Sequence, residues 1–161
     1  MRSLNARFLL AILLVLTMTI IPLPDVIAVF RPPWVMLFVL YVQFYLPRYF
    51  RVTWVFILGL SMDVLLASVF GEHAFALLVA SCLAASKARR FNFFSIAQQM
   101  ILIALFCMVY QLIIVLIDSS LGYNNKIMFA IGTIFLTMIV WPWAKMLADN
   151  TLGFMDKNSK I

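Results

Sequence analysis

Residues 91–117 read FNFFSIAQQMILIALFCMVYQLIIVLI, a run of 27 residues that contains no charged side chain. About 20 predominantly apolar residues are enough for a helix to cross the hydrocarbon core of a bilayer. Ser95 and Gln98 have the spacing of a capping box, in which two side chains satisfy backbone N–H groups at the start of a helix. The stretch therefore predicts a membrane-spanning helix over 95–117.

The composition of the whole chain indicates the same class of protein. The chain has 161 residues, of which 66% are hydrophobic and 11% are charged, and its mean hydropathy is +1.09. A soluble domain is roughly 45–50% apolar and about 25% charged, and a short globule has too little interior to bury a larger apolar share. These values exclude a soluble enzyme, a secreted domain and a disordered tail, and they indicate an integral membrane protein.

Charged residues divide the chain into six apolar blocks with short connections between them. We therefore expect an all-α integral membrane protein in which residues 1–161 form a single multi-pass domain, a bundle of six transmembrane helices. The second and fourth blocks are short, and arginine and lysine side chains that reach the membrane surface would extend them. The six spans are expected at 8–24, 32–47, 52–71, 74–88, 95–117 and 127–147.

The distribution of the 12 Lys and Arg residues sets the expected orientation, because cytoplasmic loops are enriched in cations. Six spans with a cytoplasmic N-terminus leave Arg31 and Lys126 on the outer side. Omitting the fourth span would place five cations inside and seven outside, which is less favourable. Both termini are therefore expected in the cytoplasm, and the net charge of +6 is assigned to topology rather than to nucleic-acid binding. The ten cations expected inside are Arg2, Arg7, Arg48, Arg51, Lys87, Arg89, Arg90, Lys145, Lys157 and Lys160.

Asp63 is the charged residue inside the expected third span. A carboxylate there costs about 2.5–3.5 kcal/mol on insertion scales, so its side chain should face other helices rather than lipid. Gly59, Asp63, Ala67 and Gly71 recur every four residues and are expected to form one small-residue stripe for helix packing. A hydrogen-bonded structural contact is the favoured interpretation of Asp63, and a partner-binding point and an ion relay are the alternatives.

Two segments rich in proline and aromatic residues are candidate partner-binding sites. The first lies at the outer start of the second span and comprises Arg31, Pro32 and Trp34. The second lies near the inner end of the sixth span and comprises Trp141, Pro142 and Trp143. The favoured interpretation of both segments is an interfacial anchor, with a kink at the proline of the second, and partner binding is the alternative.

The sequence contains no HExxH, GxSxG or phosphate-binding loop motif. His73, beside Glu72, is expected in a solvated outer turn, since no second ligand stands at a zinc-like spacing. These features predict neither an enzyme nor a cofactor or metal site. An alternative function is the substrate-binding membrane component of a vitamin-type transporter, which would need a pocket of convergent polar groups open to the outer side.

Four segments, taken in order, resemble those of the bacterial rod shape-determining protein MreD family. They are PLPD at 22–25, FRPPW at 30–34, the Gly59-x-x-x-Asp63 pair followed by Gly71, and WPW at 141–143. The size of the chain, its six apolar blocks and its expected cytoplasmic termini are also similar to that family.

The resemblance implies a non-enzymatic inner-membrane scaffold of the cell-wall elongation machinery, which binds MreC and helps to maintain rod cell shape. It implies action beside the actin-like MreB, the RodA glycosyltransferase and a penicillin-binding transpeptidase, and a fold that resembles the substrate-binding components of energy-coupling-factor transporters. On this hypothesis Arg31 and Trp34 would contact MreC at the outer edge, Trp141 and Trp143 would do so near the inner leaflet, and Asp63 would fix helix packing.

Overall fold

A computed structural model describes residues 2–20, 32–122 and 127–151 of the chain. Within these ranges the regular secondary structure is helical, and they contain no strand. The elements are α1 (Arg2–Ile20), α3 (Trp34–Tyr45), α4 (Val52–Leu66), α5 (Glu72–Ala85), the short α6 (Ala88–Phe91), α7 (Ile96–Ser120) and α8 (Ile127–Thr151).

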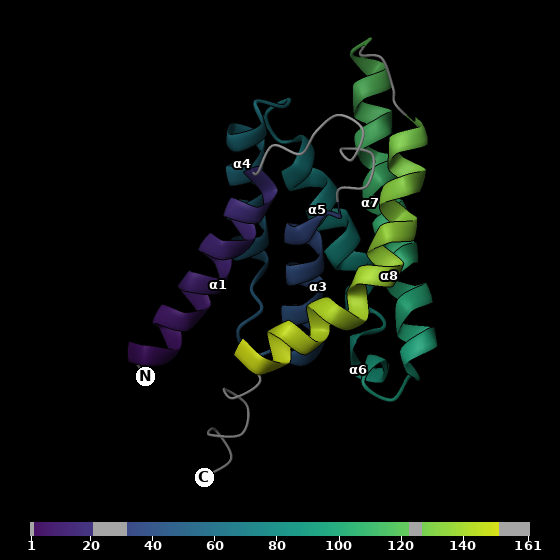
Figure 1. The fold of residues 1–161 in the computed structure, drawn as a ribbon. Helices are drawn as coiled ribbons and strands as arrows, with labels where there is room; N and C mark the ends of the chain where they lie inside the picture. Colours follow the sequence, from purple (N-terminus) through teal and green to yellow (C-terminus); the bar gives the residue numbers. More distant parts are fainter. Residues whose placement is uncertain (1, 21–31, 123–126, 152–161) are drawn as a thin grey trace.

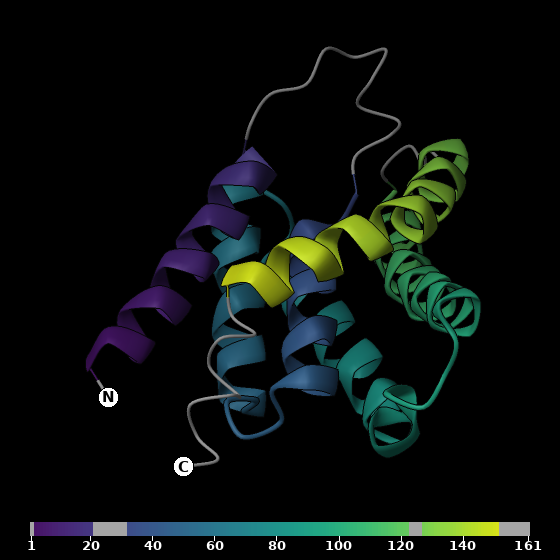
Figure 2. The ribbon, with the colours of Figure 1, turned by 60° about the horizontal axis from the view of Figure 1, so that its bottom comes forward.

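The six longer helices alternate in direction in sequence order (Figure 1). α4 packs on α5, α5 on α7, α7 on α8, and α1 on α3. The start of α1 and the end of α8 consequently lie toward the same end (Figures 1 and 2). The result is an antiparallel bundle in which most helices pack on a neighbour in the sequence.

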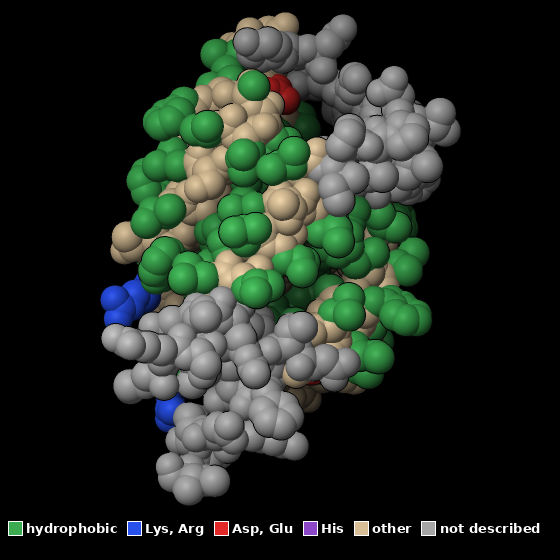
Figure 3. Space-filling model, turned by 60° about the vertical axis from the view of Figure 1, so that its left-hand side comes forward, with side chains coloured by type: hydrophobic (Ala, Val, Ile, Leu, Met, Phe, Trp, Pro, Cys, Tyr) green, Lys and Arg blue, Asp and Glu red, His purple; other side chains and the backbone are tan. Residues whose placement is uncertain are grey.

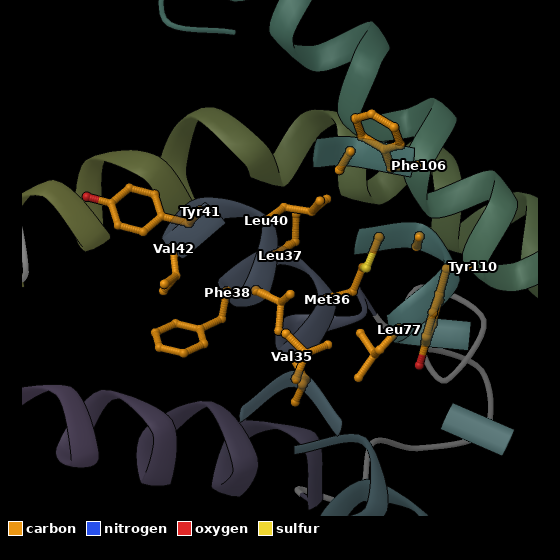
Figure 4. Packing of buried hydrophobic residues seen from close by; sticks show 14 of the residues in the cluster. Val35, Met36, Leu37, Phe38, Leu40, Tyr41, Val42, Leu77, Phe106 and Tyr110 are labelled. Carbon is orange, nitrogen blue, oxygen red and sulfur yellow. The ribbon is translucent and has the colours of Figure 1, made fainter. Parts of the chain in front are cut away.

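α3 is the central helix of the bundle. Every residue from Val35 to Phe44 is buried, and α1, α5, α6, α7 and α8 all contact this helix. Its side chains point in several directions, with Phe38 toward α1 and Met36 toward Leu77 and Tyr110 (Figure 4). A helix that is apolar on all sides is stable where other elements cover it. The sequence of α3, WVMLFVLYVQFY, is of this kind, and the helix is covered.

The outer faces of the surrounding helices are apolar. Figure 3 shows hydrophobic side chains over much of the described part of one face, with lysine and arginine near its lower part. A water-soluble monomer rarely exposes contiguous apolar surface on this scale. Exposed examples are Leu10 and Leu13 of α1, Ile57 and Val64 of α4, Phe75 of α5, Leu112 and Leu116 of α7, and Phe135 and Ile139 of α8.

Two of the helices are long and apolar enough to cross a membrane, Ile96–Ser120 and Ala130–Asp149. Four apolar helices are shorter: Phe8–Ile20, Trp34–Tyr45, Val52–Leu66 and Glu72–Ala85. The expected all-helical class is confirmed for the described residues. The number of spans and the side on which the termini lie stay predictions.

The helix expected over 52–71 is shorter in the structure. α4 ends at Leu66, because Ala67 adopts the left-handed conformation with a φ of 50°. Gly71 has a φ of 94° where α5 begins, a conformation that glycine adopts without the steric cost that a Cβ atom brings. Residues 67–71 therefore form a turn rather than the last part of a helix.

The remaining helix bounds differ less from the expected ranges. α3 ends at Tyr45 because Leu46, which precedes Pro47, leaves the helical conformation. The capping box expected at the start of α7 is confirmed: the Gln98 backbone N–H donates to Ser95 Oγ, and the Ser95 N–H donates to Gln98 Oε1. α7 and α8 extend a few residues beyond 117 and 147. The end of the first expected span, 21–24, lies outside the described residues.

α8 changes direction along its length. Its first part lies beside α7, and its last part turns away and crosses the bundle in front of α3 (Figure 1). Pro142 lies inside the helix, where its missing N–H removes one helical hydrogen bond. Two contacts hold the last part against α3: Tyr41 donates a hydrogen bond of 2.7 Å to Asp149 Oδ1, and Lys145 Nζ lies 4.9 Å from the centroid of the Tyr45 ring.

α4 and α5 approach each other closely at Gly59. A Cβ atom added there would lie 2.8 Å from the backbone nitrogen of Ala74 and against its Cα atom. Backbone atoms cannot rotate aside as the end of a side chain does, so the two helices would have to separate. The absence of a side chain at Gly59 therefore sets the distance between α4 and α5.

We expect Gly59→Ala to lower the thermal stability of the protein purified in detergent. Overpacking costs about 1–3 kcal/mol, which exceeds the gain of about 1 kcal/mol from replacing glycine in a helix. Val64→Ala, on the exposed face of the same helix, is the control and should change stability by less than about 0.5 kcal/mol. Equal melting temperatures for Gly59→Ala and the unaltered protein would contradict the close approach.

Candidate functional site

Asp63 lies in the last turn of α4, and its side chain points into the bundle with the residue 2% exposed. Its Oδ2 atom accepts a hydrogen bond of 2.8 Å from the Gly71 backbone N–H, and its Oδ1 atom accepts one of 2.8 Å from the His73 N–H. The Ser68 hydroxyl donates a longer bond of 3.3 Å to Oδ1. The carboxylate therefore joins the end of one helix to the start of the next.

The position of the carboxylate has a simple physical reason. The first N–H groups of a helix have no acceptor within that helix, and the positive end of the helix dipole favours a negative charge. Gly71 and His73 are at the start of α5, and neither N–H is satisfied by a side chain of its own turn. Asp63 supplies the missing acceptors from α4, so it closes the hairpin that α4 and α5 form.

His73 does not lie in a solvated turn, as its sequence context suggested. Its side chain is 12% exposed, and Nδ1 lies 3.0 Å from Asp63 Oδ1, where the Nδ1–H tautomer donates a hydrogen bond. The ring also lies edge-on to Tyr110, with 6.3 Å between the centroids. Sequence reasoning missed this contact because ten residues separate the partners. Gly71 between them, a turn-forming residue, was the available signal for a hairpin.

The four residues of the expected stripe do not share one helical face. Gly59 and Asp63 lie on the buried side of α4. Ala67 is exposed and ends the helix, and Gly71 begins α5. Gly59 and Asp63 thus have the spacing of one helical face. Ala67 and Gly71 are instead the two residues of the following turn that take positive φ angles.

The structure places the candidate partner-binding residues in different environments. Arg31 lies outside the described residues, Pro32 is buried, and Trp34 is half-buried at the start of α3. At the other end of the bundle, Pro142 is half-buried. Trp141 is 1% exposed and its ring lies edge-on to Phe91, whereas Trp143 is 69% exposed. Of these two tryptophans, the exposed one is available to a partner and the buried one packs the bundle.

Polar side chains also join helices inside the bundle. Gln43 Nε2 of α3 donates a hydrogen bond of 2.8 Å to the backbone oxygen of Ser81 in α5. Cys107 of α7 lies 3.5 Å from the hydroxyl of Thr137 in α8. Hydrogen bonds of this kind stabilise helix association where apolar surroundings supply no other partner. The sequence contained these residues but gave no signal for their pairing.

The chemistry of these groups is that of packing and recognition. Among the described residues, no group of three or more His, Cys, Asp or Glu side chains is arranged to hold a metal ion. The most polar cluster, formed by Asp63, Ser68 and His73, is occupied by its own hydrogen bonds.

Comparison with known proteins identifies the family. The family of rod shape-determining protein MreD matches residues 1–150 of the chain. The chain belongs to the MreD family. A curated member, rod shape-determining protein MreD of Haemophilus influenzae, is 30% identical over 126 residues, which cover 78% of each chain. No solved structure matches. Membership of the MreD family assigns this chain to rod shape determination, and the expected fold resemblance to transporter components stays a prediction.

We expect Asp63→Ala to destabilise this MreD-family protein strongly. The substitution leaves the N–H groups of Gly71 and His73 without their acceptor, and a buried donor without a partner costs about 1–3 kcal/mol. The melting temperature in detergent should fall, and hydrogen exchange at residues 71 and 73 should accelerate. Asp63→Asn keeps one carbonyl acceptor, so its melting temperature should lie between those of Asp63→Ala and the unaltered protein.

Ser68→Ala is the matched control for this experiment, because it removes the longest of the contacts to the carboxylate. Its free energy of unfolding should stay within about 0.5 kcal/mol of that of the unaltered protein. Its melting temperature should therefore change little. Unchanged exchange at residues 71 and 73 in Asp63→Ala would show that the carboxylate does not hold the start of α5.

Proposed function

We propose that this protein is a non-enzymatic scaffold of the cell-wall elongation machinery in the bacterial inner membrane. In this proposal it crosses the membrane six times, binds MreC and helps to maintain rod shape beside MreB, RodA and a penicillin-binding transpeptidase. The observation that carries the proposal is the apolar outer surface of the bundle, in a chain that belongs to the MreD family. A protein built of lipid-facing helices offers its helical surfaces for function.

The alternating directions of the helices support six crossings. α3 has 12 residues and is ~18 Å long, against ~30 Å of hydrocarbon. Non-helical backbone at membrane depth is tolerated where protein surrounds it. The burial of α3 from Val35 to Phe44 satisfies this condition, since the other helices cover it on all sides. A short central helix is therefore compatible with a full crossing.

The distribution of charge supports cytoplasmic termini. One end of the bundle, which we call the basic end, carries the connections before α4 and α7 and the end of α8 (Figure 1). The opposite end carries Asp63, Glu72 and Asp118. Because cations accumulate on the cytoplasmic side, the basic end is the inner one in this proposal. The basic residues described there are Arg48, Arg51, Lys87, Arg89, Arg90 and Lys145.

Thiol labelling in cells tests this topology. With Cys82 and Cys107 replaced by alanine, Ser119→Cys should react with a membrane-impermeant maleimide in spheroplasts. Asn92→Cys, on the turn before α7, should react after permeabilisation and not before. Both positions are exposed in the structure, so access to the reagent depends on the side of the membrane. Labelling of both cysteines from the same side would contradict an uninterrupted crossing of α7.

Trp143 is the described tryptophan best placed for contact with MreC. It is exposed on α8, and Ile139 and Leu147, at helical spacings of four residues, are exposed on the same face. Large aromatic side chains contribute strongly to interfaces because they bury much apolar area. In the proposed complex, the membrane anchor of MreC packs on this face, while Trp141 fixes the position of α8 from inside the bundle.

We expect Trp143→Ala to reduce MreC recovered with the tagged protein at least several-fold, and to round the cells when it replaces the native copy in a rod-shaped host. Loss of an interfacial aromatic anchor costs about 2 kcal/mol or more. Phe75→Ala removes an exposed aromatic from α5, away from this face of α8, and should leave MreC recovery and cell length unchanged. Normal MreC recovery with Trp143→Ala would contradict the assignment of this face to MreC. Cells that keep their rod shape without the protein would contradict the proposed function.

A further inference from the structure

A hollow at the basic end of the bundle has no role in the function described above. It lies between the start of α7 and the last part of α8 and has a volume of about 230 Å³. Part of its wall is apolar and part carries charge. The residues that matter here are Ile96, Trp141, Pro142 and Met146, which are apolar, and Lys145 and Asp149, which are charged.

The two charged residues have opposite signs and stand one helical turn apart, yet they do not form an ion pair with each other. Lys145 Nζ lies over the Tyr45 ring, and Asp149 accepts a hydrogen bond from the Tyr41 hydroxyl. Tyr41 and Tyr45 are stacked, with 5.1 Å between their ring centroids. This pair of α3 side chains holds the cation and the anion apart on the wall of one hollow.

Two other lining residues, Gln99 and Trp141, carry polar atoms. Gln99 Oε1 accepts a hydrogen bond of 3.1 Å from the Tyr45 hydroxyl, and Gln99 Nε2 donates one of 3.0 Å to the Phe94 backbone oxygen. Trp141 is 1% exposed, and its Nε1–H has no hydrogen-bond partner among the described residues. Buried polar groups in folded proteins nearly always have a partner. The Nε1 atom is itself buried, so the donor that the hollow offers to an oxygen-rich anionic group is the Lys145 ammonium group.

The chemistry of the hollow selects its ligand. A simple anion would meet the Asp149 carboxylate, and a simple cation would meet the Lys145 ammonium group, so neither satisfies both charges. The rim is apolar and open to the exposed side chains of Ile96 and Met146. A ligand that carries a phosphate, an ammonium group and hydrocarbon chains matches all three features.

We propose that this hollow binds the head group of phosphatidylethanolamine from the inner leaflet. Lys145 Nζ binds the phosphate oxygens, Asp149 accepts hydrogen bonds from the primary ammonium group, and the acyl chains lie along Ile96 and Met146. The lipid would wedge between α7 and the bent end of α8 and hold that end in place. This inference rests on the membrane placement proposed above. It does not depend on the proposed contact with MreC.

Native mass spectrometry of the full-length protein tests the selectivity. The protein is delipidated in detergent and offered equal amounts of phosphatidylethanolamine and phosphatidylglycerol. One phosphatidylethanolamine should be retained in preference. Lys145→Gln should reduce its retention about tenfold, since a hydrogen bond to a charged group is lost. Asp149→Asn should remove the preference over phosphatidylglycerol, because the remaining charge of the hollow is positive.

Lys145→Arg keeps the cation and should retain the lipid. Arg89→Gln removes one exposed cation from the same end of the bundle and is the matched control, which should bind as the unaltered protein does. Equal retention of the two lipids by the unaltered protein, or equal losses in Lys145→Gln and Arg89→Gln, would overturn the proposal.

A second experiment uses the unaltered protein, so that a folding defect in a variant cannot obscure the result. A phosphatidylethanolamine with a photoreactive group beside the phosphate, incorporated into membranes of cells that express the protein, should crosslink to residues 96–99 and 141–149. Crosslinks confined to other segments, or a hollow occupied by a protein segment instead of lipid, would overturn the assignment. The thiol-labelling result is independent, so a failure of topology and a failure of lipid binding are distinguishable.

Discussion

The bond network of Asp63 is the constraint on which the arrangement of α4 and α5 depends. A helical hairpin needs its connecting backbone to be satisfied, and the turn at 67–71 leaves N–H groups at the start of α5 without acceptors of their own. One buried carboxylate satisfies two of them and also binds His73. Close packing at Gly59 then fixes the distance between the same two helices. The free-energy cost of burying this carboxylate is thereby offset by the hydrogen bonds that it accepts.

A second consequence follows from the burial of α3. Because α1, α5, α6, α7 and α8 pack around it, α3 buries its apolar side chains against protein. The surrounding helices carry the exposed apolar residues. The chain therefore contains two kinds of apolar helix, one buried in the core and the others exposed at the surface. Composition alone does not distinguish them. The bundle is thus a packed core inside an apolar shell.

The two ends of the bundle differ in their chemistry. At the end with the α4–α5 turn, Asp63 and His73 form internal hydrogen bonds. At the basic end, the last part of α8 turns across the bundle (Figure 1), and its charged residues contact tyrosines of α3. Two positions apart on this helix, Trp141 packs inside the bundle and Trp143 faces outward. In the proposals above, a protein partner and a lipid use different faces of this helix.

The sequence by itself determined the helical class, the positions of the apolar segments, the start of α7 at its capping box and the family. These features are local or compositional, so a single chain displays them. The tertiary structure decided that α4 stops at Leu66, that His73 binds Asp63, that α3 is central and that Trp141 is buried. A period of four residues describes a helix and equally spans a turn, and exposure depends on which neighbours arrive from distant parts of the chain. Such contacts are fixed by packing in three dimensions, where residues ten or a hundred positions apart become partners.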